Sequence, residues 1–269
     1  MGEGRNIFLG RCVFVTSFKG GVGKSFVTAN LAGALCSLGK SVLVVDGDFG
    51  MRSMDILLGK ENNTLFDIKD VILGICSVES AVIKGDGSKP DFIPAPQTYD
   101  GSALDPKRTG KLFAYLKSVY DFVLIDSSAE YSPYYSLLAS CADSAVIVTA
   151  HQSTSVRAAE KTAALLAKEG LTDQHLVINM FRKKEADKGL LPDPADIIMN
   201  SAVPLIGIVP WDKNAAVEAE KGNIAFCSHK GKAYSYEAAA INIAYRLCGS
   251  TVPLFGGVYR TMKRKYYLT

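Results

Sequence analysis

The chain has 269 residues, of which 48% are hydrophobic and 21% are charged, and 24 of them are glycine. A chain of this length can bury a large core, and it suits one α/β domain as well as two small ones. Its net charge is +3, but residues 251–269 hold four basic residues and no acidic one, so the remaining chain is near neutral. A near-neutral body argues against a nucleic-acid surface that dominates the whole fold.

The sequence predicts neither a membrane span nor a secretion signal. No apolar run approaches the roughly 18 to 20 residues that cross a bilayer. The first residues include an acid and lack the basic start and cleavage site of a signal peptide. The six cysteines form no CxxC pair, and scattered thiols in such a chain indicate a reducing cytosol. We therefore expect a cytoplasmic protein. The histidines His151, His175 and His229 lack metal-ligand spacing, so no zinc site is predicted.

Six short apolar runs are rich in β-branched residues and do not alternate polar with apolar side chains. Such runs are typical of strands that are buried on both faces, as in a parallel sheet covered by helices. The predicted strands are residues 11–16, 41–46, 122–126, 145–149, 176–180 and 205–209.

Helical patterns separate the predicted strands. Apolar residues recur at helical spacing over residues 25–38, and Gly39 follows at a suitable capping position. The repetition predicts a doubly wound α/β fold, with a mostly parallel sheet and helices on both faces. The Pro/Gly-rich stretch 84–106 is interpreted as a surface excursion inside one domain. We predict a single domain over residues 1–250 and a basic tail over residues 251–269.

The strongest chemical signal is residues 17–25 (SFKGGVGKS), between the first strand and the first helix. Glycines let the backbone turn closely around a phosphate chain, and the helix N-terminus favours its negative charge. Lys24 is placed to contact the β- and γ-phosphates, and the Ser25 hydroxyl to coordinate Mg²⁺. The pattern GxxxxGK[ST] requires glycine where Phe18 stands, so the match departs by one residue. The alternative is a glycine-rich turn without a ligand.

That departure is informative, because residues 19–25 (KGGVGKS) resemble the deviant Walker A motif KGGVGK[ST] of the MinD/ParA superfamily of P-loop ATPases. The resemblance implies that Lys19 is catalytic and reaches across a dimer interface to the partner's ATP, while Lys24 acts on ATP bound in its own chain. The alternative for Lys19 is an ordinary solvated lysine. The resemblance implies nucleotide contacts from Lys19, Gly20, Gly21, Val22, Gly23, Lys24, Ser25 and Phe26.

Two acidic segments resemble the same superfamily. Residues 46–55 (DGDFGMRSMD) are similar to the D-x-D-x-G-x-R-x-x-D segment of MinD-like proteins, and residues 121–130 (DFVLIDSSAE) to their stretch FDYVVIDSPAG. The resemblance makes Asp48 the catalytic acid nearest the attacking water, with Asp46 in a supporting role. Acids at the end of a strand beside a phosphate loop can also hold a metal's water shell. The implied metal-holding residues are Ser25, Asp48 and Asp126.

The similarity is colinear from about residue 11 to residue 225, and MinD-like proteins are its most similar branch. Asn179 ends the fifth predicted strand, where superfamily members use Asn to read adenine. Pro210 and Asp212 match the P-x-D loop on the adenine side. The resemblance therefore implies that all three residues bind the nucleotide.

The chain also departs from MinD-like proteins at several positions. Phe26 stands where they usually have Thr, which removes a hydroxyl for the α-phosphate and weakens nucleotide binding by about 0.5 to 1.5 kcal/mol. Ser128 and Glu130 replace Pro and Gly in the switch segment, so its flexibility and partner surface should differ. Ala158 replaces an acid, so partner contacts assigned to that acid do not carry over.

Apolar side chains of the tail, from Leu254 to Tyr266, fall on one side of a helical wheel. A basic amphipathic helix can lie in an anionic membrane interface, where each cation adds about 1 kcal/mol. MinD-like proteins end in a similar segment. The alternative is a helix packed on the body or a frayed terminus. The basic residues of the tail are Arg260, Lys263, Arg264 and Lys265.

These features predict an ATPase that uses ATP and Mg²⁺, forms an ATP-dependent homodimer and responds to a regulatory protein that stimulates hydrolysis. Paired tails would hold it at the inner face of the cell membrane, and division-site placement is the predicted role. The alternatives are a ParA-type partition ATPase, a flagellum- or pilus-positioning ATPase, and a weakly active scaffold of the same fold. Nucleic acid is the less favoured partner, because the body is near neutral.

Overall fold

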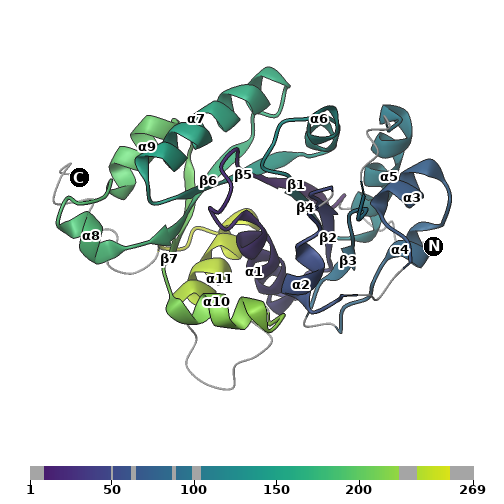
Figure 1. Ribbon diagram of the computed structural model, residues 1–269, viewed down its shortest axis with the longest axis horizontal. Coiled ribbons are helices and arrows are strands. Elements are labelled where there is room, and N and C mark those ends of the chain that lie inside the picture. Colours follow the sequence, from purple (N-terminus) through teal and green to yellow (C-terminus); the bar gives the residue numbers. More distant parts are fainter. Residues whose placement is uncertain are drawn as a thin grey trace, which may run out of the picture.

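One parallel sheet organises the fold. The structure is a computed structural model, and it describes residues 9–49, 51–61, 65–86, 89–98, 104–223 and 235–254. Within these residues, seven parallel strands pair in the order β3-β2-β4-β1-β5-β6-β7, which places β1 in the middle of the sheet (Figure 1). The strands are β1 (Arg11–Thr16), β2 (Val42–Gly47), β3 (Asp91–Ile93), β4 (Phe122–Ser127), β5 (Ser144–Ala150), β6 (Gln174–Phe181) and β7 (Leu205–Pro210).

The doubly wound α/β prediction is confirmed, and every predicted strand is present. Their observed ends differ from the predicted ones by at most two residues. The prediction worked because the interior of each strand is apolar and buried on both faces, as in β2 and β5, where every residue is buried.

The interpretation of residues 84–106 as a surface excursion is wrong in its middle part. β3 lies within this stretch and pairs with β2, so that Phe92 opposes Val44 and Ile93 opposes Val45. The side chains of Phe92 and Ile93 are fully buried. A three-residue strand at the edge of the sheet is too short to show periodicity, and the surrounding Pro and Gly residues concealed it.

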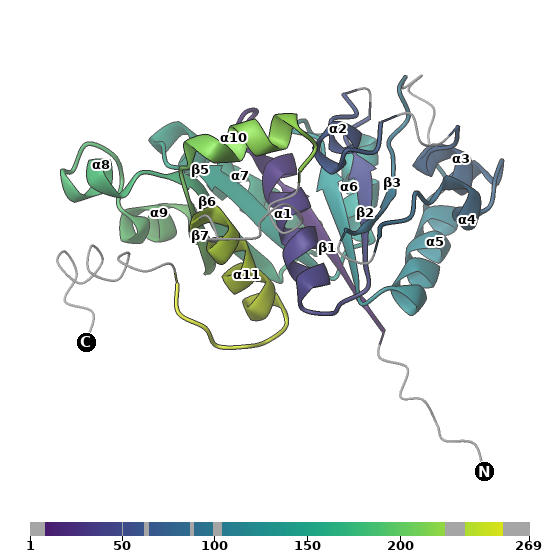
Figure 2. The same ribbon diagram turned by 90° about the horizontal axis from the view of Figure 1, so that it is seen from below.

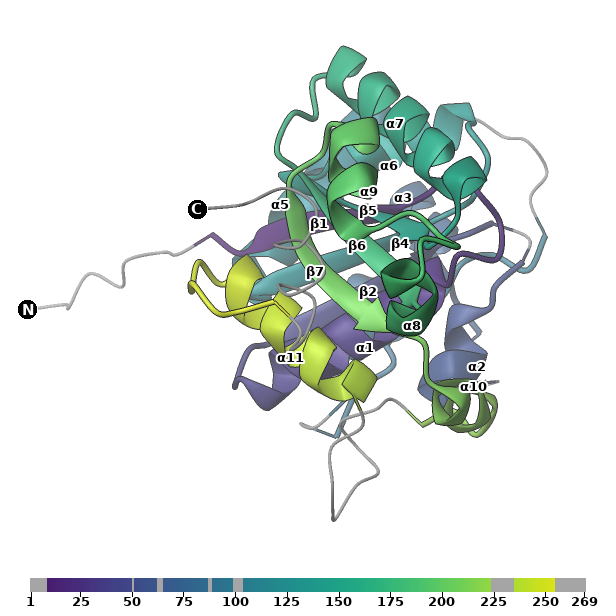
Figure 3. The ribbon, with the colours of Figure 1, turned by 90° about the vertical axis from the view of Figure 1, so that its left-hand side faces the viewer.

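Helices cover both faces of the sheet, as Figures 1 and 3 show. One face packs against α1 (Lys24–Ser37), α2 (Met54–Leu58) and α11 (Ser235–Leu247). Side chains from another group of helices form the hydrophobic core on the opposite face. That group is α3 (Ile68–Leu73), α5 (Pro106–Val119), α6 (Pro133–Ser140), α7 (Ser153–Lys168) and α9 (Pro194–Ser201).

The predicted first helix is observed as α1. It ends at Ser37, with Leu38 as its C-cap, and Gly39 follows with a φ of +76°, which a side chain would disfavour. Three short helices complete the described residues: α4 (Val78–Ala81), α8 (Lys183–Asp187) and α10 (Lys213–Glu220). Figure 2 shows α10 beside α2, at one end of α1.

The tail cannot be compared with its prediction, because every tail residue beyond Leu254 lies outside the described residues. None of the helices in the described part of the chain is both long enough and apolar enough to cross a bilayer.

Candidate functional site

The loop of residues 17–23 carries the chain from β1 into α1. Gly21 and Gly23 have φ values of +75° and +81°, which favour glycine. A Cβ on Gly23 would also lie 2.3 Å from Asn179 Nδ2, so a close approach requires this glycine as well. Gly23 caps α1 without a side-chain hydrogen bond, so the amides of the first turn stay available to an anion.

Asp126 connects the loop to the end of β4. Its Oδ2 accepts a hydrogen bond from Ser25 Oγ at 2.6 Å and lies 3.3 Å from Lys24 Nζ. Its Oδ1 accepts from Thr28 Oγ1 at 2.8 Å. Asp126 is fully buried, and a carboxylate in such a place needs a cation and hydrogen-bond donors to stay charged. The structure therefore brings Asp126 to Lys24 and Ser25, which belong to a different motif of the sequence.

Asp46 lies next to Asp126, because the two residues are register partners on β2 and β4. Burial raises the pKa of Asp46 to about 7, and the neighbouring Asp126 charge adds to the rise. Its carboxylate accepts from the backbone amides of Asp48 at 2.9 Å and Met54 at 3.4 Å. Asp46 thus holds the backbone that carries Asp48.

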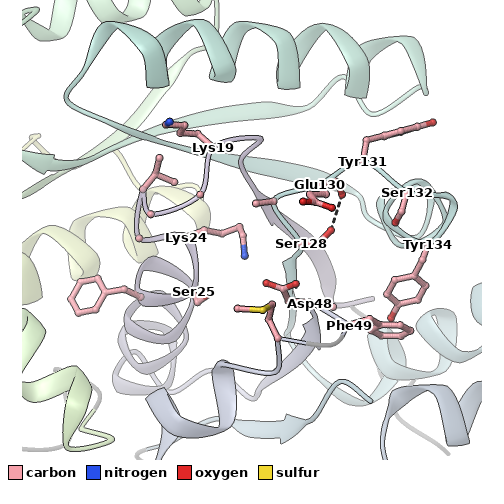
Figure 4. A pocket seen from close by; sticks show the side chains of 18 residues that line it. Lys19, Lys24, Ser25, Asp48, Phe49, Ser128, Glu130, Tyr131, Ser132 and Tyr134 are labelled. Carbon is pink, nitrogen blue, oxygen red and sulfur yellow. Dashed lines mark hydrogen bonds between the residues drawn. The ribbon is translucent and has the colours of Figure 1, made fainter. Parts of the chain in front are cut away.

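Asp48 reaches the open part of the site. Burial raises its pKa above the ordinary value, Lys24 opposes that rise, and the charges of Asp126 and Glu130 add to it. Figure 4 shows the Lys24 amine directed into the cavity toward Asp48, whereas the side chain of Lys19 points away from it. Lys19 is exposed, so it can reach a molecule outside this chain.

These side chains border one cavity of about 700 Å³, large enough for a nucleoside polyphosphate. Its lining combines the loop after β1, the loop after β2 and the segment after β4, which meet at the carboxyl edge of the sheet. A Cβ on Gly20 or Gly21 would meet no atom within 4 Å, so the front of the loop is open. The lining residues are 19–26, 47–49, 51, 128–132 and 134.

Phe26 lines this cavity at the base of α1, where the resemblance implies Thr. Its ring lies 5.7 Å from the ring of Tyr236 on α11. The Phe26 side chain therefore joins α1 to α11 through an apolar contact. Phe26 thus makes a packing contact at the position where the resemblance implies a Thr whose hydroxyl would face a phosphate.

The predicted adenine-side residues lie at the ends of β6 and β7 and are not part of the cavity lining. Asn179 is buried, and its Nδ2 donates to the carbonyl of Val22 at 2.8 Å, so it touches the phosphate loop. Pro210 pairs with Phe181 across β6 and β7. The Asp212 side chain caps α10 by accepting from the amide of Asn214 at 2.9 Å. In this structure Asn179 is therefore hydrogen-bonded to the phosphate loop, and Asp212 is hydrogen-bonded to the start of α10.

Sequence reasoning missed some residues of the site. Thr28 lies one turn after Lys24 and was read only as part of a helix. Phe49 and Tyr134 stack on each other at the edge of the cavity, with ring centroids 3.6 Å apart. The position of Phe49 next to Asp48 was visible in the sequence, but nothing indicated its partner. Among the described residues no group of three or more His, Cys, Asp or Glu side chains is placed to hold a metal ion, and His229 lies outside those residues.

The geometry suits one kind of ligand. The Lys24 amine, the open loop amides and the first turn of α1 favour a polyphosphate anion. The available oxygen ligands are the Ser25 hydroxyl and carboxylates behind it. Mg²⁺ prefers such ligands and keeps most of its water, so it needs no group of three side chains.

Comparisons with known proteins show which family the chain resembles. The model of the CobQ/CobB/MinD/ParA nucleotide binding domain matches residues 13–225. The septum site-determining protein MinD of Bacillus subtilis is 35% identical over 250 residues, which covers 91% of this chain and 92% of that protein.

Solved structures are similar over the same extent. MinD in the MinC:MinD cell division protein complex of Aquifex aeolicus has a TM-score of 0.82 and 30% identity, covering 91% of this chain and 98% of that one. MinD of Pyrococcus horikoshii complexed with Mg-ADP has a TM-score of 0.77 and 26% identity, covering 88% and 95%.

Proposed function

This chain belongs to the CobQ/CobB/MinD/ParA nucleotide-binding family of ATPases, and from that premise we propose that it is a MinD-like spatial switch controlled by ATP. In this proposal residues 1–250 act as one ATPase domain that dimerises around Mg-ATP. Its role is division-site placement, with reversible attachment to the inner face of the membrane. The observation that carries the proposal is the convergence of Lys24, Ser25 and Asp126 beside an outward-facing Lys19.

The phosphate-binding steps follow from the geometry. The loop amides and Lys24 hold the β- and γ-phosphates of ATP, and Lys24 turns from Asp126 to the phosphate oxygens. Ser25 and Asp126 would hold Mg²⁺. When bound, Mg²⁺ supplies positive charge that offsets the charge of the phosphates. Asp48, directed into the cavity, orients the attacking water and the metal's water shell.

Dimerisation assigns a role to Lys19. Its side chain is exposed and turned away from Lys24, so it can reach the phosphates bound to a second copy of the chain. Two like-charged lysines on one triphosphate stabilise charge that neither could offset alone. A regulatory protein that stimulates hydrolysis completes the cycle, and the Aquifex complex shows that a relative of this chain binds a partner protein.

The membrane part of the proposal rests on the basic tail. Two tails on one dimer share an effective concentration, so they can bind a surface that a single tail binds weakly. ATP state then controls location. Peripheral attachment of this kind requires no spanning helix.

One observation favours a second candidate, a weakly active scaffold of the same fold. Phe26 replaces a hydroxyl with an apolar ring, and Glu130 adds a negative charge to a cavity that binds anions. Both changes oppose tight ATP binding. A scaffold would bind nucleotide but hydrolyse it too slowly to cycle.

Light scattering tests the switch. The hydrolysis-deficient Asp48→Ala variant should double in mass with Mg-ATP and stay monomeric with Mg-ADP. The matched variant Lys19→Ala should bind ATP equally well and remain a monomer, because its loop and Lys24 are intact. Absence of any ATP-dependent mass change in Asp48→Ala would reject the dimerisation cycle.

A further inference from the structure

Phe49, the residue after Asp48, packs its ring against the ring of Tyr134 on α6. The ring centroids are 3.6 Å apart and the ring planes meet at 31°. Tyr134 is 5% exposed, whereas Phe49 is half-buried at the cavity edge. Figure 4 shows the two rings side by side beyond Asp48. The loop after β2 is thus attached to the first turn of α6 directly beside the acid assigned to hydrolysis.

The first turn of α6 is a rigid support. Ser132 caps the helix by accepting a hydrogen bond from the amide of Tyr135 at 3.0 Å. The Tyr135 ring packs edge-on against Phe14 at 4.9 Å, and its hydroxyl lies 2.7 Å from Thr16 Oγ1. Phe14 and Thr16 belong to β1, the central strand that leads into the phosphate loop. Tyr134 therefore extends from a turn whose position is tied to that loop.

Hydrogen bonds hold Asp48 through its backbone and leave its carboxylate to the cavity. Its backbone amide donates to Asp46 Oδ1 at 2.9 Å, which fixes the backbone on the β2 side. Its carbonyl accepts from the amides of Met51 at 3.3 Å and Arg52 at 3.2 Å. Within the described part of the chain, no protein hydrogen bond holds its carboxylate, and Met51 is 76% exposed. The Phe49 side chain adds an anchor on the other side, where it packs against Tyr134 and the edge of the core.

We infer that Tyr134 is a positioning residue, which holds the Asp48 carboxylate in the cavity through its stacking contact with Phe49. The inference rests on the proposed function, since it assigns a second residue to the hydrolysis that Asp48 supports. The three loops that form the phosphate end of the site are tied together by neighbouring tyrosines of one helix turn. A displaced ring moves the acid without moving the phosphate loop.

Replacing Tyr134 should lower the rate of ATP hydrolysis and leave the affinity for ATP nearly unchanged. Tyr134→Ala removes the stacking partner, so the Asp48 loop samples other positions and kcat for ATP falls about two- to tenfold. The dissociation constant for ATP should change less than twofold, because Lys24 and the loop amides are unaffected. Tyr134→Phe keeps the ring and should keep kcat near the wild-type value. Equal losses in the Ala and Phe variants would contradict a role for the ring.

A second tyrosine supplies the matched control. Tyr120 is 8% exposed and lies at the opposite, amino edge of the sheet, where its hydroxyl bonds Asp91. Tyr120→Ala should lower the melting temperature by an amount comparable to that of Tyr134→Ala but leave kcat unchanged. If Tyr120→Ala lowers kcat to the same extent, the effect of Tyr134 is general destabilisation and the inference fails.

A double-mutant cycle tests the route through Phe49. Phe49→Ala should lower kcat by a similar factor, and the double variant Phe49→Ala/Tyr134→Ala should lose no more than either single variant. Multiplicative losses would show that the two rings act independently, which overturns the inference.

Hydrogen exchange tests whether Tyr134 positions the Asp48 loop even if the wild-type chain hydrolyses no ATP. The amides of Asp48 and Met54 both donate to the Asp46 carboxylate. They should exchange several times faster in Tyr134→Ala than in Tyr134→Phe, without nucleotide. Unchanged exchange would overturn the inference, whereas a wild-type protein without ATPase activity would count only against the proposed function.

Discussion

The Lys24 amine lies 3.3 Å from Asp126 Oδ2, and both side chains are almost wholly buried. The same oxygen accepts a hydrogen bond from Ser25 at 2.6 Å. In this arrangement the cation and the hydroxyl that would serve a nucleotide satisfy a buried carboxylate instead. Nucleotide binding therefore exchanges one set of charge-assisted contacts for another, and the net affinity is the difference between them.

Replacing Lys24 should abolish ATP binding, because the phosphates lose the cation at the centre of the loop. We expect no measurable heat for Lys24→Ala in calorimetry with Mg-ATP. Lys19→Ala, which removes an exposed lysine from the same loop, is the control and should retain the wild-type affinity. Circular dichroism should show that Lys24→Ala is folded. Wild-type affinity in Lys24→Ala would contradict the assignment of the loop.

Asp46 should contribute a loss of stability to the nucleotide-free protein as pH rises from about 4 to about 7. Burial raises the pKa of Asp46 from 3.8 to about 7. In that window the folded protein keeps a proton that the unfolded chain has released, so the free energy of unfolding decreases with pH. Asp46→Asn cannot ionise and should lose less stability between pH 5 and pH 8. Urea unfolding at both pH values, without Mg²⁺, measures the difference. An identical pH dependence in the two proteins would show that Asp46 ionises normally.

Phe26→Thr should bind ATP more tightly and be less stable. The new hydroxyl can bond the α-phosphate, which is worth about 0.5 to 1.5 kcal/mol, or roughly two- to tenfold in the dissociation constant. The variant also loses the contact between Phe26 and Tyr236, so its melting temperature should fall. Phe26→Ala loses the same contact without gaining a hydroxyl and is the matched control. Equal affinities in the Thr and Ala variants would argue against an α-phosphate contact here.

Glu130→Gln should raise the affinity for ATP more than the affinity for ADP. Glu130 lines the cavity, and its charge helps to raise the pKa of Asp48. Removing that charge reduces repulsion of the phosphate chain, which is greatest for the triphosphate. The effect should shrink at high salt, since Glu130 is exposed. Glu160→Gln, an exposed acid on α7 outside the cavity, should change neither affinity. Calorimetry measures the ratio of ATP affinity to ADP affinity, which should be higher in Glu130→Gln than in the wild type. An unchanged ratio would contradict the prediction.

Deleting residues 254–269 should abolish ATP-dependent membrane binding and leave ATP binding intact. The full-length chain should sediment with anionic liposomes in ATP but not in ADP, and high salt should weaken binding. Pairing two tails on one dimer can raise binding by roughly 10² or more. If the truncated chain sediments as well as the full-length chain, the tail has another role.

Local patterns in the sequence determined much of this protein. The apolar runs predicted the buried strands, and the glycine-rich motif placed Lys24 and Ser25 at the start of α1. Strand interiors and helix starts are governed by residues within a few positions of one another, so a single chain displays them. β3 was not predicted, because three residues at the edge of a sheet are too few to show a hydrophobic pattern.

Only the tertiary structure decided which of these residues meet. Asp126 is about a hundred positions from Ser25 and Thr28, and the pairing of β1 with β4 brings it to their hydroxyls. The pairing of β2 with β4 sets Asp46 beside Asp126 and, with burial, raises the pKa of Asp46. The contact of Phe49 with Tyr134 likewise depends on how α6 packs. Strand order and helix packing are set by the burial of the whole core. Burial brings distant residues together, but no local sequence pattern indicates which residues will meet.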